Sequence, residues 1–432
     1  MKKITFFLIV NLLLSSCHKF KDFIPPHPTP QFNKTFGGSA DDAAASVVAS
    51  PDGGYVMAGY TNSNNGDVSG NHGSTDAWIV KLDKHGEMLW QRALGGSSND
   101  AANHITATSD GGYIITGYTD SNDGDVSGNH GARDAWIVKL NREGNIIWQR
   151  ALGGSAGDGA NSITTTTDGG YILTGSTESN DGDVSGQHGG FDAWIVKLDR
   201  EGNILWQKTL GGSESDGASS VIATIDHGYI IAGSTESNDG DVSGNHGDGS
   251  SDVWVVKLDR EGNLLWQKTL GGSDTEGASS IIPTIDHNYI IAGTTQSDNG
   301  DVSVQHGVGD VWVVKIDGSG NILWEKTLGG ADFDVANYMT TAWNGGYIIA
   351  GSTYSNDGDV SGNHGQFDAW VVRLDREGNI LWQETLGGIN FDHGLFISKT
   401  QHGNYVMAGR TQGNEEDAEG IHYDAWIVTL KD

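Results

Sequence analysis

The chain has 432 residues, with 65 glycines, 14 tryptophans, one cysteine and a formal charge of −31. A single cysteine excludes a disulfide framework, and the aromatic content excludes a disordered chain. Acidic residues (56) outnumber Lys and Arg (25). This balance argues against nucleic-acid binding, which depends on basic side chains that neutralise phosphates. Cations, sugars and protein partners remain as ligand classes.

The amino terminus is typical of an export signal. Two lysines precede an apolar run over residues 4–14, which is too short to span a bilayer as a helix. The segment Leu-Ser-Ser-Cys at residues 14–17 follows and resembles the lipobox of bacterial lipoproteins. The resemblance implies cleavage before Cys17, acylation of Cys17 with palmitate-like chains, and an outer-membrane location. The alternative is an ordinary secretory signal with a chance cysteine.

A proline-rich segment separates the cysteine from the rest of the chain. Residues 18–31 hold four of the six prolines, and such a segment is extended and semi-rigid. We therefore predict a signal peptide at 1–16, a lipidated cysteine with its tether at 17–31, and a folded body at 32–432. Several acyl chains together anchor a protein stably to a bilayer. Whether the body lies on the periplasmic or the cell-surface side is left open.

The body repeats with a period of roughly 58 residues. The motif [GN]-Y-[VI]-[MIL]-[AT]-G recurs at Tyr55, Tyr113, Tyr171, Tyr229, Tyr289, Tyr347 and Tyr405. The motif D-[AV]-W-[IV]-V recurs at Trp78, Trp136, Trp194, Trp254, Trp312, Trp370 and Trp426. A third marker has only six copies, at Trp90, Trp148, Trp206, Trp266, Trp324 and Trp382, which leaves Trp343 outside the repeat. The missing copy has a degenerate counterpart at residues 32–38, so an amino-terminal strand is expected to complete the seventh unit.

Each unit contains four strand signals, which in the fourth unit are residues 219–224, 229–234, 253–258 and 264–270. The first is rich in small residues, the third is apolar on both sides, and the fourth alternates as a half-exposed edge strand does. We therefore predict an all-β fold, a seven-bladed β-propeller with four antiparallel strands per blade and the last blade closed by the N-terminal strand.

The segment 197–208, followed by two glycines, resembles the repeats of pyrroloquinoline-quinone-type and outer-membrane-assembly-lipoprotein propellers. In those repeats a tryptophan after the turn docks on the next blade, which the resemblance implies for this chain. The turn here is one residue shorter and lacks the threonine. The units look closest to the tandem β-propeller repeats of exported bacterial surface proteins.

A twelve-residue pattern recurs between the second and third strands, on the face where we expect the long loops. Oxygen-bearing residues stand at positions one, three and five, and an aspartate stands at position twelve. This spacing resembles the EF-hand calcium loop and, more loosely, the calcium loops of integrin-type propellers. The candidate ligands are Asn65, Asp67, Ser69 and Asp76; Asp123, Asp125, Ser127 and Asp134; Asp181, Asp183, Ser185 and Asp192; Asp239, Asp241, Ser243 and Asp252; Asn299, Asp301, Ser303 and Asp310; and Asp357, Asp359, Ser361 and Asp368.

This pattern predicts structural calcium, although serine at position five and aspartate at position twelve imply weaker binding than in an EF-hand. The other units have a glycine at position six, which is Val304 in the fifth unit. In the fourth unit the last aspartate slips two positions to Asp252, and the seventh unit keeps only the first half, at 415–420. The alternative is a polar loop whose Asp, Asn and Ser side chains cap turns.

Two further residue types recur once per unit. An acid opens each first strand, at Asp42, Asp100, Asp158, Asp216, Glu276, Asp334 and Asp392. These acids either form a carboxylate ring that attracts cations or bond the amides of the crossover loop, and we favour the second. A histidine recurs at His72, His130, His188, His246, His306, His364 and His422. One histidine per blade is too dispersed for zinc, so we interpret it as a structural contact.

No catalytic constellation is distinguishable from the repeat, and near-identical blades give equal environments, so we predict a binding protein rather than an enzyme. The expected function is a membrane-anchored extracytoplasmic scaffold for protein partners on the long-loop face. Unequal residues in the loops, such as 415–423, Phe333 and Phe391, favour a protein partner on one side of the ring. A glycan-binding, lectin-like propeller is the alternative, although most tryptophans are expected to be buried between blades.

Overall fold

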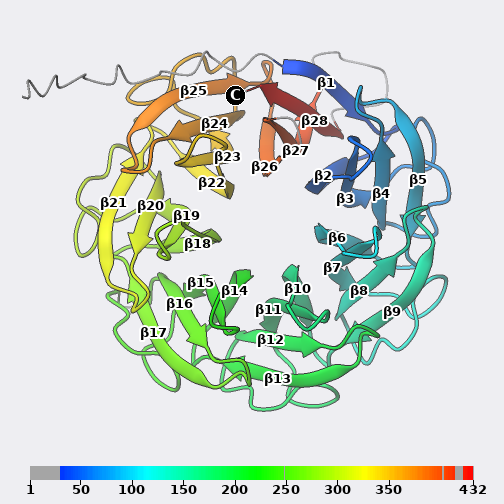
Figure 1. Ribbon diagram of the computed structural model, residues 1–432, viewed down its shortest axis with the longest axis horizontal. Helices are drawn as coiled ribbons and strands as arrows, with labels where there is room; N and C mark the ends of the chain where they lie inside the picture. The colour runs from blue at the N-terminus through cyan, green and yellow to red at the C-terminus, as the bar shows by residue number, and fades with distance from the viewer. Residues whose placement is uncertain (1–29, 248, 401–402, 414–421, 432) are drawn as a thin grey trace, which may run out of the picture.

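The computed structural model describes residues 30–247, 249–400, 403–413 and 422–431. Strands are the regular elements of these ranges, and no helix there could cross a membrane. The strands form seven four-stranded antiparallel sheets arranged as a ring around a central opening (Figure 1). The predicted all-β, seven-bladed propeller is therefore confirmed. We number the blades 1–7 from β2, so that blade 7 contains β26, β27, β28 and β1.

The inner strands are β2 (Asp42–Ala49), β6 (Asp100–Ala107), β10 (Asp158–Thr165), β14 (Asp216–Ala223), β18 (Glu276–Pro283), β22 (Asp334–Thr341) and β26 (Asp392–Lys399). The second strands are β3 (Tyr55–Thr61), β7 (Tyr113–Thr119), β11 (Tyr171–Thr177), β15 (Tyr229–Thr235), β19 (Tyr289–Thr295), β23 (Tyr347–Thr353) and β27 (Asn404–Gln412). The third strands are β4 (Asp76–Leu82), β8 (Asp134–Leu140), β12 (Asp192–Leu198), β16 (Asp252–Leu258), β20 (Asp310–Ile316), β24 (Asp368–Leu374) and β28 (Tyr423–Lys431). The outer strands are β5 (Met88–Leu94), β9 (Ile146–Leu152), β13 (Ile204–Leu210), β17 (Leu264–Leu270), β21 (Ile322–Leu328), β25 (Ile380–Leu386) and, from the amino terminus, β1 (Pro30–Phe36).

The amino-terminal strand closes the ring as expected. β1 pairs with β28 over a register in which Phe36 faces Ala425 and Pro30 faces Leu430. Trp426 Nε1 donates to Asn33 Oδ1 at 2.5 Å, and Phe36 is buried in the core between blades 7 and 1. The strand begins two residues before the predicted boundary at residue 32. Blade 7 is thus built from both ends of the folded body.

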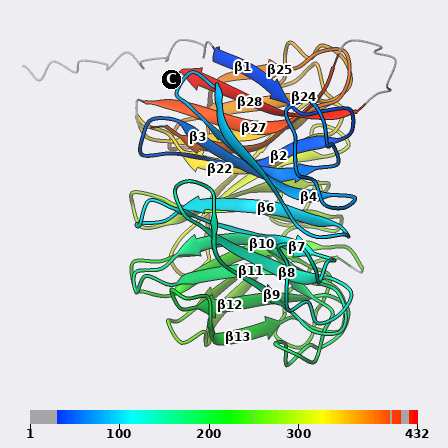
Figure 2. The same cartoon turned by 90° about the vertical axis from the view of Figure 1, so that its right-hand side faces the viewer.

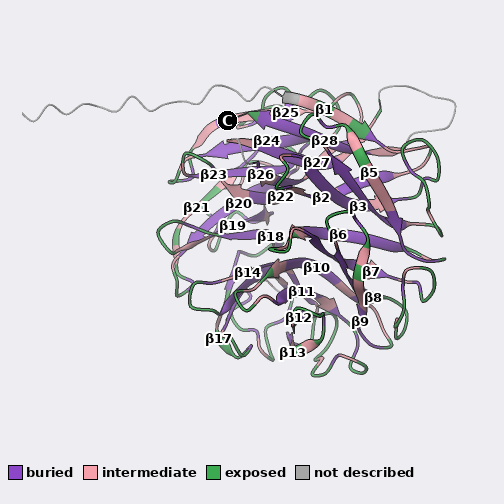
Figure 3. Cartoon of the chain, turned by 45° about the vertical axis from the view of Figure 1, so that its right-hand side comes forward, coloured by how far each residue is buried: buried purple, intermediate pink, exposed green. Residues whose placement is uncertain are grey.

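The hydrophobic core is divided among the seven blade junctions. Each junction holds one apolar cluster, such as Val56 and Ala58 of blade 1 against Ile105 and Trp136 of blade 2. The third strands of blades 1–6 are buried along their whole length, whereas most residues of the outer strands are half-buried or exposed (Figure 3). The ring is therefore held together by sheet-on-sheet packing, and each blade depends on its neighbours.

The glycine of the tyrosine motif is required for a steric reason. In blade 4, β14 bulges between Ala218 and Ser220, opposite Gly233 of β15. A Cβ on Gly233 would overlap the carbonyl oxygen of Gly217. The same strand begins three residues before the predicted 219–224, because Asp216 is already paired with Thr235.

The outer tryptophans dock on the next blade, as the resemblance implies. The ring of Trp148 in β9 lies edge-on to Tyr171 of blade 3, with 6.0 Å between ring centroids. A side chain at Gly202, in the turn between β12 and β13, would collide with the same indole. The turn glycine is therefore required by the tryptophan of the preceding blade.

Candidate functional site

The two faces of the ring carry different connections. The turns between first and second strands and between third and fourth strands, such as 166–170 and 199–203, lie on one face, which we call the short-turn face. The connections from second to third strands and the crossovers to the next blade lie on the opposite, long-loop face. Figure 2 shows the blades edge-on, with their connections at the two sides. This arrangement follows from the antiparallel order and agrees with the sequence prediction.

The residues of the predicted calcium loop contact different neighbours. In blade 2, Asp123 Oδ1 accepts from the Ser97 N–H of the preceding crossover at 2.7 Å. Ser127 Oγ accepts from Gln149 of the outer strand at 2.7 Å. Asp134 Oδ2 instead accepts from the backbone N–H of His130 at 3.0 Å. The four candidate side chains are therefore not gathered into one coordination set.

The other blades repeat this arrangement. Crossover amides donate to the position-one side chains of Asn65, Asp123, Asp181, Asp239, Asn299 and Asp357. Glycine carbonyls of the crossovers accept from the backbone N–H groups of Asp67, Asp125, Asp183, Asp241, Asp301 and Asp359. Outer-strand glutamines donate to Ser69, Ser127, Ser185, Ser243 and Ser361. In the blade of Ser303 the outer strand carries Glu325 in place of the glutamine. The motif thus fastens each long loop to the preceding crossover.

The position-twelve aspartates are buried and bonded to the recurring histidines. The pairs are His72–Asp76, His130–Asp134, His188–Asp192, His246–Asp252, His306–Asp310 and His364–Asp368, with Nδ1 to Oδ2 distances of 2.6 to 3.3 Å. The structural interpretation is therefore confirmed for these six histidines, whereas His422 Nε2 lies 3.9 Å from Oδ1 of Asp424. Burial raises the pKa of Asp134, and the hydrogen bond from His130 offsets part of that rise. Oδ1 of the same carboxylate is buried without a hydrogen-bond partner.

The acids that open the inner strands bond the crossover loops. Asp100 is fully buried, and its Oδ2 accepts from the Gly96 N–H at 2.7 Å and from Ser121 Oγ at 2.7 Å. Asp42, Asp158, Asp216, Glu276, Asp334 and Asp392 accept the equivalent backbone bond. These acids therefore form no exposed carboxylate ring. Among the described residues, no group of three or more His, Cys, Asp or Glu side chains is placed to hold a metal ion.

The blades differ most on the long-loop face of blades 6 and 7. There Tyr354, Phe367, Phe391, His393 and Tyr423 form a continuous chain of ring contacts, with centroids 5.1 to 6.5 Å apart. The guanidinium of Arg410 lies over the Tyr423 ring, 4.4 Å from its centroid. We call these six residues the aromatic sector. Residues 414–421, which contain most of the predicted partner segment, lie outside the described residues.

The aromatic sector is only partly covered by the rest of the protein. Tyr354 is 41% exposed, and the other rings are half-buried. Burial and the nearby Arg410 lower the pKa of His393 to about 4, so this imidazole is neutral at physiological pH. Its Nδ1 is hydrogen-bonded to Ser352 Oγ at 3.0 Å. The sector therefore presents neutral rings and one cation in an otherwise acidic protein.

The prediction of Phe391 as part of an asymmetric surface matches this cluster, whereas Phe333 lies beside it against Gly309. Tyr423 is the last residue of the predicted 415–423 segment, and the other four members were missed. Phe367 directly precedes the third strand β24, Tyr423 is the first residue of the third strand β28, and His393 is the second residue of the inner strand β26. An alignment of the seven units would have revealed them, because the equivalent positions in blades 3–5 are mostly glycine, serine or threonine.

A second set of unequal residues meets at the central opening. Most inner strands carry serine midway along, but three carry His104, Tyr338 and Phe396. The rings of Tyr338 and Phe396 stack with centroids 3.7 Å apart, and His104 lies 5.4 Å from Phe396. Burial lowers the pKa of His104 to about 4. These uncharged rings come from inner strands on different sides of the central opening and narrow it. A cavity of about 210 Å³ remains among the inner strands.

No family model matches the chain. It is similar to the Regulatory protein FlaEY of Caulobacter vibrioides, with 24% identity over 222 residues that cover 48% of this chain and 23% of the relative. It is also similar to the uncharacterized WD repeat-containing protein L264 of Acanthamoeba polyphaga mimivirus, with 21% identity over 435 residues, 78% of this chain and 31% of the relative. The chain thus spans less than a third of the length of these curated relatives.

Similar solved structures include Sqt1 from Chaetomium thermophilum (TM-score 0.46, 11% identity, 88% of this chain and 82% of that chain). A protein of unknown function from Bacteroides caccae (0.43, 14%, 71% and 89%) and the Synechocystis apocarotenoid oxygenase (0.44, 13%, 81% and 73%) are also similar. These likenesses concern the fold and identify no activity. The resemblance to pyrroloquinoline-quinone-type and lipoprotein repeats stays a prediction.

Proposed function

We propose that this protein is a lipid-anchored, extracytoplasmic scaffold that binds a protein partner through the aromatic sector. The observation that carries the proposal is the chain of five rings and one arginine on the long-loop face of blades 6 and 7. The propeller is a fold that interaction scaffolds commonly use. Loops on a rigid scaffold are the usual place for recognition.

The composition of the aromatic sector is that of a protein interface. Tyr, Phe and Arg are enriched in the buried centres of such interfaces because they supply large contact areas with few flexible bonds. The sector occupies one side of the ring, so it supports one partner per molecule rather than seven equivalent ligands. Its neutral His393 needs no proton change on burial, and we expect binding to vary little between pH 6 and 8 for this reason.

Truncation of Phe391 should weaken partner binding. We expect Phe391→Ala to cost about 2 kcal/mol, or roughly 30-fold in Kd, because the ring contacts Phe367 and His393 at the middle of the sector. The partner is first captured from outer-membrane extracts with the full chain, and its Kd is then measured in purified form. Ser215→Ala, at the equivalent position of blade 4, is the matched control. Equal losses in the two variants would count against the sector.

Anchoring at Cys17 predicts a specific mature species. Mass spectrometry of the membrane-derived protein should find Cys17 as the first residue, carrying acyl chains, and Cys17→Ala should abolish both the acylation and the cleavage before this residue. A mature chain that begins elsewhere, or that retains an unmodified cysteine, would remove the anchor from the proposal. Cys17 and residues 18–29 of its tether lie outside the described residues.

The sequence predicts structural calcium in the long loops, whereas the hydrogen bonds of these side chains point to a loop that is stable without it. Because hydrogen bonds to neighbouring segments already occupy the loop side chains, we expect EDTA to leave the melting temperature unchanged. A fall in the melting temperature that added calcium restores, but magnesium does not, would establish a structural calcium site. The matched control is Asp123→Asn, which keeps the hydrogen-bond acceptor and removes the charge.

Glycan binding is the alternative function. The seven repeated core tryptophans are buried, so they offer no stacking surface, whereas the aromatic sector is a partly exposed group of rings on the long-loop face. A glycan array with the full chain separates the two functions. Hits that Phe391→Ala abolishes would favour the lectin, and an array without hits would leave the protein partner.

A further inference from the structure

The short-turn face is built on a repeated ion pair that blade 6 lacks. In blades 1–5 a lysine of the third strand bonds an aspartate in the turn between the first and second strands, as Lys315 bonds Asp286 at 2.8 Å. Blade 6 has Arg373 and Asn344 at these positions. Its turn therefore carries no acid, and Arg373 instead donates to the carbonyl of Gly345 at 2.7 Å.

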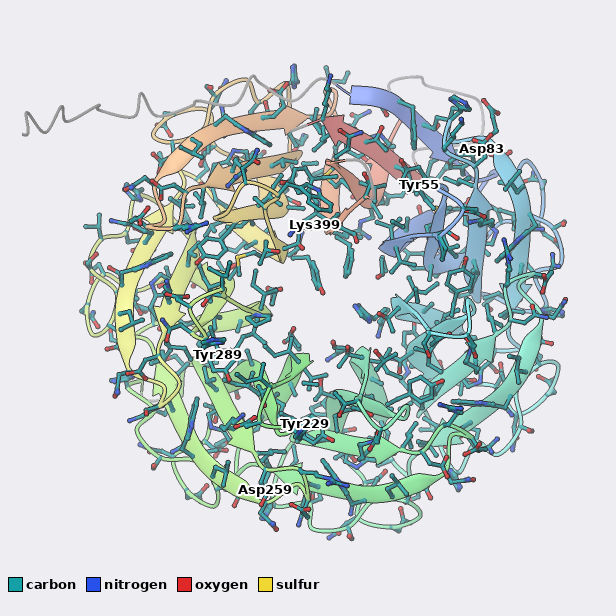
Figure 4. The ribbon with its side chains drawn as sticks, in the orientation of Figure 1. Tyr55, Asp83, Tyr229, Asp259, Tyr289 and Lys399 are labelled. Atoms are coloured by element: carbon teal, nitrogen blue, oxygen red, sulfur yellow. The ribbon has the colours of Figure 1, made fainter. Side chains whose placement is uncertain are left out.

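A cleft of about 610 Å³ lies beside this turn, between blades 5 and 6. Ile285, Trp343, Arg376 and Lys399 are among its lining residues. Trp343 is the one tryptophan outside the repeat; its Nε1 donates to the carbonyl of Asn404 at 3.3 Å, which orients the ring. Lys399 Nζ lies 5.1 Å from the centroid of that ring, and Figure 4 places Lys399 beside the central opening.

The cleft has a positive excess in a protein of net charge −31. Lys315 is neutralised by Asp286, and Glu377 stands next to Arg376 in the chain. Within the described ranges no carboxylate is paired with Arg376 or Lys399. Burial lowers the pKa of Lys399, and Arg373 lowers it further because the two cations lie close together. An anion bound beside Lys399 in the cleft would relieve this repulsion.

Exposed apolar side chains stand at the tips of neighbouring turns on the short-turn face. Ile225 and Ile285 stand at the tips of the equivalent turns of blades 4 and 5, where they are 80% and 82% exposed, and Trp343 occupies the same turn position at 46% exposure. Three consecutive blades therefore end in apolar side chains at one level. Two of these turns hold His227 and His287 at φ values of 64° and 62°, where other blades have glycine. Such left-handed backbone in a non-glycine residue is uncommon.

The chain enters the ring from this face. Pro30 at the start of β1 is paired with Leu430, near the end of β28, and β28 runs from the long-loop face to the short-turn face. Twelve residues separate Cys17 from Pro30, so the start of β1 lies within about 45 Å of that cysteine. An anchor at Cys17 would therefore hold the short-turn face toward the membrane.

The charges of the two faces agree with an orientation in which the short-turn face is turned toward the membrane. The long loops and crossovers contain many Asp and Glu residues, whereas Arg133 is their only Lys or Arg. The turns and strand ends of the opposite face carry nearly as many bases as acids. An acidic face turned toward anionic lipid would be repelled, whereas a balanced face with a local positive cleft would not.

We propose that the short-turn face of blades 4–6 docks on an anionic lipid surface, with the tips of Ile225, Ile285 and Trp343 at the headgroup level and a lipid phosphate between Arg376 and Lys399. This inference rests on the proposed membrane anchor and extends it. Tryptophan, long aliphatic side chains and basic residues are the set that membrane interfaces favour. The aromatic sector then faces away from the bilayer, toward its partner.

A membrane surface explains the apolar and basic side chains of the short-turn face better than an acidic protein partner does. The three tips project from separate blades at one level, which suits a broad flat ligand rather than a peptide confined to the cleft. The tips and the cations lie on the face from which the tether leaves, so a bilayer reaches them without a further partner. Binding of a free anion or of an acidic protein remains as an outcome of the test.

The test uses the full chain with vesicles of phosphatidylcholine that contain phosphatidylglycerol with brominated acyl chains. Bromine quenches tryptophan at short range, and Trp343 is the most exposed tryptophan in the described ranges. We expect a quenchable component of fluorescence that Trp343→Phe abolishes. Each basic residue near an anionic lipid surface contributes about 1 kcal/mol of binding free energy, which corresponds to about fivefold in affinity. Lys399→Gln should therefore weaken the binding that this quenching reports about fivefold. Lys268→Gln, on the outer strand, should leave it unchanged.

The experiment distinguishes a wrong docking face from an absent lipid anchor. If the protein floats with the vesicles but Trp343→Phe keeps the wild-type quenching, the docking face is wrong and the anchor stands. If Cys17 carries no acyl chain, the same vesicles added from outside still test the face, because quenching through Trp343 is expected without the anchor. Quenching that inorganic phosphate removes, and chloride at equal ionic strength does not, would indicate a free-anion site and overturn lipid docking. Equal quenching by vesicles of phosphatidylcholine alone would also contradict the role of the two cations.

Discussion

Removal of residues 1–36 is expected to destroy the closed ring. This deletion removes β1, exposes the edge of β28, and leaves Trp426 without its bond to Asn33. Phe36 leaves the core between blades 7 and 1, and the loss of one buried phenylalanine alone costs about 3 to 5 kcal/mol. We expect either no folded protein or a strongly lowered midpoint of denaturant unfolding, measured by tryptophan fluorescence.

The matched control is removal of residues 1–29, which leaves β1 and all of its contacts in place. We expect its unfolding midpoint to equal that of the full chain. Because closure of the ring buries an edge that would otherwise pair with other chains, the shorter deletion should also stay monomeric where the longer one aggregates. Equal midpoints for the two deletions would mean that β1 does not fasten the ring.

Substitution of a glycine opposite an inner-strand bulge should be the most damaging single change. In Gly233→Ala the new methyl group would overlap the backbone oxygen of Gly217, and neither strand can move without breaking the ladder between β14 and β15. We expect a loss of about 3 kcal/mol or more in the free energy of unfolding. Differential scanning calorimetry of the full-length variant measures it.

Gly217→Ala is the control for this prediction. Gly217 lies on the same pair of strands, and a Cβ there would meet no atom within 4 Å. The chain itself tolerates larger residues at the equivalent position, with alanine in blades 1 and 2 and Val335 in blade 6. We expect a change of no more than about 0.5 kcal/mol. A larger loss in Gly217→Ala than in Gly233→Ala would contradict the steric account of the tyrosine motif.

The architecture was predictable because the repeat encodes it locally. Seven tyrosine motifs and a third tryptophan marker with six copies specify the number of blades and the split one, and the alternation of residues 264–270 specifies the outer edge. Such periodicity needs no knowledge of distant contacts. The buried third strands follow from the same reasoning.

The sites were less predictable because they depend on contacts between units. The spacing of Asp123, Asp125 and Ser127 fits a cation, but a crossover amide and Gln149 compete for the oxygen atoms, and spacing within one loop cannot reveal those neighbours. The aromatic sector likewise joins Phe367 to His393 and Tyr423, which belong to three separate segments. Trp343 stood out in the sequence, yet its cleft requires Lys399 from the next blade.

We propose that the aromatic sector, rather than the ring as a whole, recognises a protein partner. A photo-crosslinking amino acid placed at Phe391 of the full chain in intact membranes tests this recognition, with the equivalent Ser215 of blade 4 as the comparison. We predict one defined crosslinked product at position 391, which Phe367→Ala in the same chain weakens strongly, and none at position 215. Equal crosslinking at both positions, or none at either, would contradict the account.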